Sequence, residues 1–211
     1  MSSNGRVVKR ASTKDGQASF RMIRNRITQF KKVAKEKLPS TPDNSKLAKT
    51  FFEILKFIHK NRWKGACHAT SAIMYILLKE QGIDARLYIG ECQRGSSAFD
   101  HSWIEIDGEV VDAAISKTWI QGKSFPPVLR NIDLETGKKT KIVYGVHSGQ
   151  GYGQLASTIR DLPLYMYMDI FPYHPEGLWG LAKEIGTRIG IKTNLEKMKG
   201  KYCLTKWEEH S

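Results

Sequence analysis

The sequence contains 211 residues, of which 40% are hydrophobic and 26% are charged. This composition is typical of a globular protein with a buried core and excludes a disordered or fibrous chain. No stretch approaches the roughly 20 consecutive apolar residues that span a bilayer. The polar, basic first residues lack the apolar centre of a secretory signal, so we expect a soluble, cytoplasmic protein.

The formal net charge of +13 is concentrated at the N-terminus. Residues 1–40 contain 11 Lys and Arg against Asp15 and Glu36, a net charge of +9, which leaves +4 for the other 171 residues. We predict that residues 1–42 form a basic, partly disordered arm that carries an amphipathic helix. Such an arm fits nucleic acid, an acidic protein or an anionic membrane surface, or stays solvated without a partner.

Three helices are predicted in the N-terminal part of the chain. Residues 1–19 show no periodic pattern, whereas residues 20–37 place apolar side chains at helical spacing between Lys and Arg. Prolines interrupt the pattern in "LPSTPDNS", and Asp43 or Ser45 is then expected to cap a second helix. The third helix begins at "GACH", residues 65–68, and continues through "ATSAIMYILL", which is apolar on most sides and predicts burial.

Alternating apolar and polar residues predict strands after the third helix. "IDARLYIGEC", "HSWIEI" and "EVVDA" alternate in this way, and Asp107-Gly108 between the last two is a strong signal for a two-residue hairpin turn. A second hairpin is predicted within residues 128–146, with its turn at "ETGKK", and a further helix within "PEGLWGLAKEIGTRIG". Helices followed by antiparallel strands indicate an α+β fold.

The three cysteines, Cys67, Cys92 and Cys203, make a poor disulfide framework, and none lies at CxxC spacing. We therefore expect no cofactor and no structural zinc site. Cys67 differs from the others because it lies in the first turn of the third helix, where the helix dipole and unpaired amides lower the pKa of a thiol. The same amides can hold an oxyanion, so Cys67 is a candidate nucleophile, although an isolated cysteine on an apolar helix is more often a packing residue.

The predicted hairpin places a histidine beside a carboxylate. A two-residue loop sets a register in which His101 and Asp112 project from the same face as diagonal neighbours, whereas a three-residue loop would place them on opposite faces. In the first arrangement Asp112 fixes the imidazole tautomer, and the other nitrogen of His101 exchanges a proton with Cys67. This is the logic of a catalytic triad with sulfur as the nucleophile.

"GACHATSAIMYILLKEQGIDARLYIGEC" followed by "DHSWIEIDGEVVDAA" resembles the core of the transglutaminase-like superfamily of cysteine enzymes, and "HSWIEIDGEVVD" is most similar to the bacterial branch that includes lasso-peptide leader peptidases. The resemblance implies a papain-related α+β fold, in which the nucleophile helix packs on an antiparallel sheet. It also implies a Cys67–His101–Asp112 triad that forms an acyl-thioenzyme on peptide, isopeptide or glutamine side-chain amide bonds. Residues 43–211 are then a catalytic domain with a C-terminal extension.

Several alternatives stay open at this point. Water as the acyl acceptor makes the protein a thiol protease, amidase or deamidase, whereas an amine makes it an acyltransferase of a protein or peptide substrate. Asn61 and Trp63 are weak candidates for a side chain that assists the oxyanion. If Cys67 faces the sheet, His68 is expected to point away from the working side of the thiol and to have a supporting or structural role. A non-catalytic binding module that uses the basic arm is the alternative function, and a metal site formed by the same three residues is a third hypothesis.

Overall fold

The computed structural model describes residues 14–120, 124–172 and 174–210. The described helices are α1 (Lys14–Lys37), α2 (Pro42–Lys60), α3 (Cys67–Glu80), the 3-10 helix η1 (Ala114–Lys117), α4 (Gln154–Asp161), α5 (Leu164–Asp169), α6 (Gly177–Arg188) and α7 (Leu195–Tyr202). The described strands are β1 (Ala85–Arg94), β2 (Ser97–Ile106), β3 (Glu109–Asp112), β4 (Val128–Leu129), β5 (Ile132–Asp133), β6 (Val143–Val146) and β7 (Glu208–Glu209).

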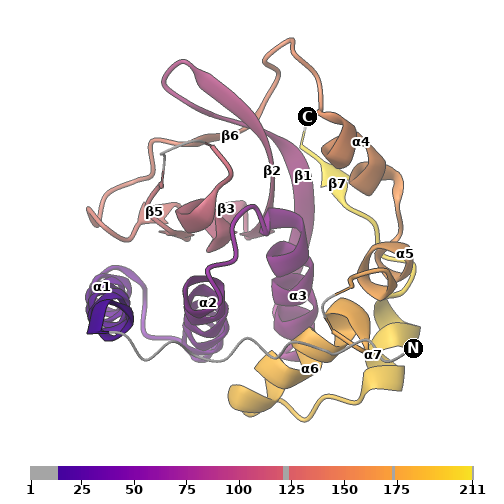
Figure 1. Cartoon of the computed structure of the whole chain (residues 1–211), viewed down its shortest axis with the longest axis horizontal. Coiled ribbons are helices and arrows are strands. Elements are labelled where there is room, and N and C mark those ends of the chain that lie inside the picture. Colours follow the sequence, from indigo (N-terminus) through magenta and orange to yellow (C-terminus); the bar gives the residue numbers. More distant parts are fainter. Residues whose placement is uncertain (1–13, 121–123, 173, 211) are drawn as a thin grey trace.

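One sheet with the strand order β5-β4-β3-β2-β1-β6 forms the centre of the molecule, and β7 pairs in parallel with β1. The pairings along that order are antiparallel, so the structure confirms the predicted α+β class. Helix α3 packs on β1 and β2, with α2 and α6 on its other sides (Figure 1). The main core lies between these helices and one sheet face. The other face carries a smaller cluster made up of Tyr88, Cys92, Trp103, Val110, Ile115, Phe125, Val128 and Ile142.

Helix α1 begins at Lys14, earlier than the sequence predicted. Residues 14–19 are helical rather than unstructured, whereas residues 1–13 lie outside the described part of the chain. Ile27, Phe30 and Ala34 are buried in the main core, so the apolar stripe of α1 packs against the rest of the molecule. The division at residue 42 into a basic arm and a catalytic domain stays a prediction.

The start of α2 differs from the expected cap. Thr41, rather than Asp43 or Ser45, is the capping residue, and its hydroxyl accepts a hydrogen bond from the Asn44 amide at 3.2 Å. Pro42 follows as the first helical residue, where the missing N–H of proline costs nothing. The residue before a proline is kept out of the helical region, which explains why the cap lies at Thr41.

The two hairpin predictions have different outcomes. Asp107 and Gly108 both have positive φ, 54° and 75°, and the two-residue loop pairs Ile106 with Glu109 as predicted. The second hairpin is misplaced, because the turn that joins paired strands β4 and β5 is Arg130-Asn131, with φ of 49° and 62°. The "ETGKK" segment closes only one isolated bridge, between Ile132 and Lys139, and β6 crosses the molecule to pair with β1.

Side-chain contacts hold the Arg130-Asn131 turn, which has no glycine. The Arg130 guanidinium donates to Glu109 at 2.7 Å, and the Asn131 side chain accepts from the Val110 amide at 3.0 Å. Because these partners are distant in sequence, local turn chemistry did not reveal the turn. The helix predicted within "PEGLWGLAKEIGTRIG" is confirmed as α6. Within the described residues, no helix has both the length and the apolar character that crossing a membrane requires.

Candidate active site

Cys67 is the first residue of α3 and is half-buried. The residue before it, Ala66, provides no side-chain cap, so the first amides of the helix are not bonded by a capping side chain. Gly65 fixes the entry to the helix with φ +62°, and its amide donates to the Lys117 carbonyl at 2.8 Å. The thiol therefore lies where the partial positive charge of the helix N-terminus is greatest.

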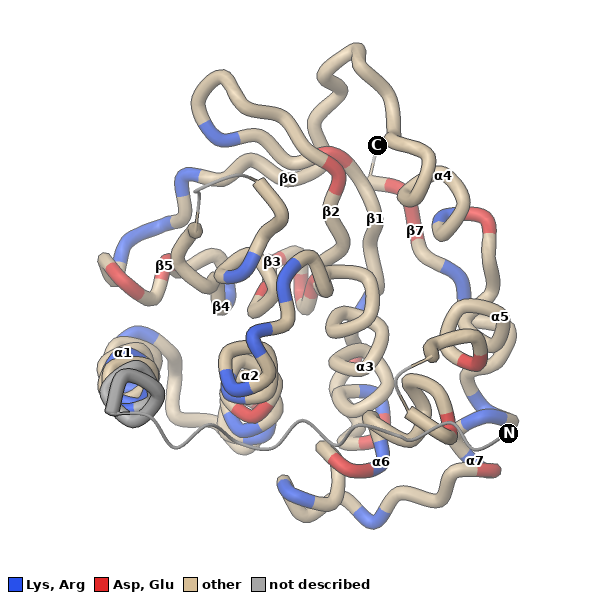
Figure 2. Tube along the Cα trace, in the orientation of Figure 1, with Lys and Arg blue, Asp and Glu red and all other residues tan. Residues whose placement is uncertain are grey.

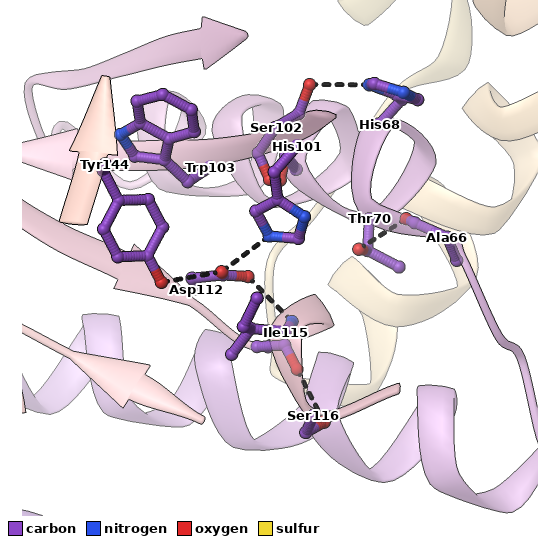
Figure 3. Close-up of polar contacts among 12 residues, drawn as sticks. Ala66, His68, Thr70, His101, Ser102, Trp103, Asp112, Ile115, Ser116 and Tyr144 are labelled. Atoms are coloured by element: carbon purple, nitrogen blue, oxygen red, sulfur yellow. Dashed lines mark hydrogen bonds and ion pairs between the residues drawn. The ribbon is translucent and has the colours of Figure 1, made fainter. Parts of the chain in front are cut away.

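His101 projects from β2 and is 2% exposed. Its Nε2 lies 2.7 Å from Oδ2 of Asp112 at the end of β3, as the hairpin register predicts (Figure 3). Because Nε2 is occupied by the carboxylate, Nδ1 is the nitrogen left to exchange a proton with the Cys67 thiol. The His101 imidazole and the Asp112 carboxylate are thus in contact. Their roles in catalysis stay a prediction.

The Asp112 carboxylate is completely buried and accepts hydrogen bonds from three sides. His101 and the Tyr144 hydroxyl approach the same oxygen, Oδ2, with Tyr144 at 3.0 Å. The amide of Ile115, in the 3-10 helix, donates to the other oxygen at 3.1 Å. These three donors compensate for the hydration that the carboxylate loses on burial.

The electrostatics of the site favour a charged thiol–imidazole pair. Burial alone would raise the pKa of Cys67, but the neighbouring His68 and His101 side chains hold it well below its ordinary value. Burial likewise opposes protonation of His101, but Asp112 and the Cys67 sulfur raise its pKa to about 10. Both shifts favour a thiolate and an imidazolium over the neutral pair.

His68 contradicts its predicted orientation. Its side chain is buried, its Nδ1 lies 2.7 Å from the Ser102 hydroxyl, and it lies close enough to Cys67 to lower the pKa of the thiol. The sequence predicted that His68 would point away from the working side of the thiol if Cys67 faced the sheet. The bond to Ser102, on the strand that carries His101, keeps His68 at the sheet. No pattern in the sequence reveals that contact.

Asn61 and Trp63 have other partners in the structure. The Asn61 amide group donates to the Phe57 carbonyl at 2.9 Å and so closes the end of α2. The Trp63 ring packs against Phe57 and Phe171, at centroid distances of 5.7 and 5.5 Å. The amides in the first turn of α3, which no capping side chain bonds, are also candidates for oxyanion binding.

A buried tryptophan, Trp103, lies two residues after His101 on the same strand. Trp103 is fully buried, stacks on Tyr88 at 5.8 Å and donates its indole N–H to Glu105 at 2.9 Å. Gly90 on β1 must lack a side chain, since a Cβ there would lie 2.8 Å from the Trp103 ring. This packing fixes the strand that positions His101.

The other cysteines lack the setting of Cys67. Cys92 is buried, and its burial and the nearby Asp112 raise the pKa of its thiol well above the ordinary value. The Cys203 sulfur lies 3.8 Å from the Gly200 carbonyl at the end of α7. Within the part of the chain that the structure describes, no group of three or more His, Cys, Asp and Glu side chains could hold a metal ion.

A family model described as the transglutaminase-like superfamily matches residues 9–121, more than half of the chain. The matched segment contains Cys67, His101 and Asp112, whereas Tyr144 lies beyond it. No curated protein matches the chain, and neither does a solved structure.

Proposed function

Because the chain belongs to the transglutaminase-like superfamily, we propose that it is a cysteine-dependent hydrolase or acyltransferase that acts on amide bonds. The observation that carries this proposal is the 2.7 Å contact between His101 and Asp112, next to a helix-terminal Cys67 whose thiol has a lowered pKa. In this proposal Cys67 is the nucleophile, His101 the general acid and base, and Asp112 the group that orients the imidazole.

The first half-reaction forms an acyl-thioenzyme. The Cys67 thiolate attacks the carbonyl carbon of a peptide, isopeptide or glutamine side-chain amide, and the carbonyl electron pair moves to oxygen. Amides at the start of α3 stabilise this oxyanion. His101 gives its Nδ1 proton to the departing nitrogen, the C–N bond breaks, and the amine or ammonia leaves.

The second half-reaction transfers the acyl group. His101, now neutral, accepts a proton from the incoming water or amine as this attacks the thioester carbon. The C–S bond breaks and restores the thiolate–imidazolium pair. Water as the acceptor makes the enzyme a protease, amidase or deamidase, and an amine makes it a cross-linking acyltransferase.

The proposal is tested by mass spectrometry of peptides and proteins incubated with the wild type. We expect cleavage, deamidation or amine incorporation that disappears in Cys67→Ala and persists in Cys203→Ala, the matched control. Reactions in ¹⁸O-labelled water, with and without added methylamine, identify the acceptor. Products that form equally with Cys67→Ala would contradict the proposal.

A groove between α1 and α2 supports a second candidate function, the binding of an anionic partner. The groove has a volume of about 640 Å³, and five of its eight lining residues are Lys or Arg. A second groove of about 590 Å³ shares Lys31 and Lys56 with the first and extends along the same two helices. Basic residues follow both helices (Figure 2). This surface suits nucleic acid or an acidic protein.

Charge reversal in the groove tests this candidate in the full chain. We expect the triple variant Arg24→Glu, Lys31→Glu and Lys60→Glu to weaken binding of an RNA oligonucleotide or an acidic peptide at least tenfold, because electrostatic contacts dominate such affinities. Lys138→Glu with Lys139→Glu, at the "ETGKK" turn, is the control. Fluorescence anisotropy at several salt concentrations measures the affinity. Equal binding by both variants would remove the candidate.

A further inference from the structure

Tyr144 reaches the catalytic carboxylate from a distant part of the sheet. Its strand, β6, lies on the far side of β1 from β2 and β3, yet its hydroxyl is 3.0 Å from Asp112 Oδ2. The sheet must therefore curl, so that β6 and β3 approach each other although β1 and β2 lie between them. The Tyr144 ring lies against Trp103 and His101, at centroid distances of 5.2 and 6.4 Å.

Several charged or titratable groups face the Tyr144 hydroxyl. Asp112 comes from β3, His101 from β2 and Cys92 from β1, and Asp112 accepts a hydrogen bond from the Tyr144 hydroxyl. Burial and the Asp112 charge raise the pKa of Tyr144 well above its ordinary value. Tyr144 therefore stays protonated and can act only as a donor toward Oδ2, the oxygen that also contacts His101 (Figure 3).

We propose that Tyr144 is a positioning residue of the cysteine centre, whose hydroxyl holds the Asp112 carboxylate behind His101. The inference rests on the proposed function, since it assigns Tyr144 a role in the same acyl transfer. Two of the three donors to Asp112 are His101 and the Ile115 amide, so Tyr144 is the third and the only one that lies outside residues 9–121. The C-terminal part of this chain thus completes a site that the family segment begins.

A packing role for the Tyr144 ring has to be separated from a role for its hydroxyl. Tyr144→Phe keeps the ring against Trp103 and removes only the donor. Tyr88→Phe is the matched control, because Tyr88 also packs on Trp103, at 5.8 Å, and has no hydrogen bond to the triad within the described residues. Circular dichroism and thermal melts establish that both variants are folded.

The experiment is the pH profile of Cys67 alkylation by iodoacetate, read by mass spectrometry. This anionic reagent favours the thiolate beside an imidazolium, so the wild-type rate falls when His101 loses its proton, at a pH of about 10. In Tyr144→Phe we expect the rate at pH 9 to fall about tenfold, because the loss of a charged hydrogen bond moves the His101 titration well below pH 10. The descending part of the pH–rate profile, here called the limb, should move to lower pH. Without the Tyr144 donor, the Asp112 carboxylate turns away from the His101 imidazolium and stabilises it less.

The outcomes separate the inference from the proposed function. Slower alkylation with a limb at lower pH in Tyr144→Phe, but not in Tyr88→Phe, supports the positioning role. A limb that stays in place or moves to higher pH overturns it, even if the variant melts at a lower temperature. If wild-type Cys67 is alkylated no faster than Cys203, the proposed function itself fails, whatever Tyr144 does.

Discussion

His101→Gln is expected to slow the alkylation of Cys67 by iodoacetamide at pH 6 by about 10- to 100-fold. Without the imidazolium, burial raises the pKa of the thiol, and a thiol with an ordinary pKa of about 8.5 is less than about 1% ionised at that pH. Part of the loss is offset because a more basic thiolate is more nucleophilic. The rate is measured by mass spectrometry of the Cys67 peptide over time.

His68→Gln is the matched control, because both histidines lower the pKa of Cys67. The Nδ1 of His68 lies 2.7 Å from the Ser102 hydroxyl, and among the residues that the structure describes no carboxylate holds its ring as Asp112 holds that of His101. We therefore expect His68→Gln to slow alkylation only a few-fold. If His68→Gln slowed alkylation more than His101→Gln did, the result would show that His68, and not His101, is the base.

Asp112→Ala is expected to lower the free energy of unfolding by about 3–5 kcal/mol at pH 7, because it leaves a buried cation without its counter-charge. The Tyr144 hydroxyl and the Ile115 amide lose their acceptor in the same change. Urea denaturation of the purified variants gives the value. The pH matters, since the pKa of His101 is raised from 6.5 to about 10 in the fold.

The sign of this pH dependence follows from linkage. A raised folded pKa means that protonated His101 contributes stability that is complete below about pH 6.5 and is lost as the pH rises through about 10. The destabilisation by Asp112→Ala should therefore be smaller above pH 10 than at pH 7. It should also be smaller in a His101→Gln background, which holds no buried cation. An equal cost in both backgrounds would show that the carboxylate does not compensate the His101 charge.

The parts of the site that the sequence predicted are those fixed by local rules. Cys67 opens an apolar helix, and the Asp107-Gly108 turn sets the register that joins His101 to Asp112. Each of these follows from spacing within a short segment, because helix termini and two-residue turns restrict the chain locally. The family segment covers the same residues.

The parts that the sequence did not predict depend on contacts between distant segments. Tyr144 meets Asp112 only because β6 pairs with β1 and the sheet curls, and a four-residue strand carries no signal for its partner. The Arg130-Asn131 turn depends in the same way on Glu109 and Val110. Pairing between distant strands is set by tertiary packing rather than by propensity.

The most direct measurement of the central claim is the order in which the three cysteines of the folded wild type react with iodoacetamide at pH 6. A thiolate stabilised by His101 at the start of α3 predicts that Cys67 is fully modified before Cys92 or Cys203 is detectably labelled. Labelling of the three at one rate, or of Cys67 last, would contradict the presence of an activated nucleophile in this site.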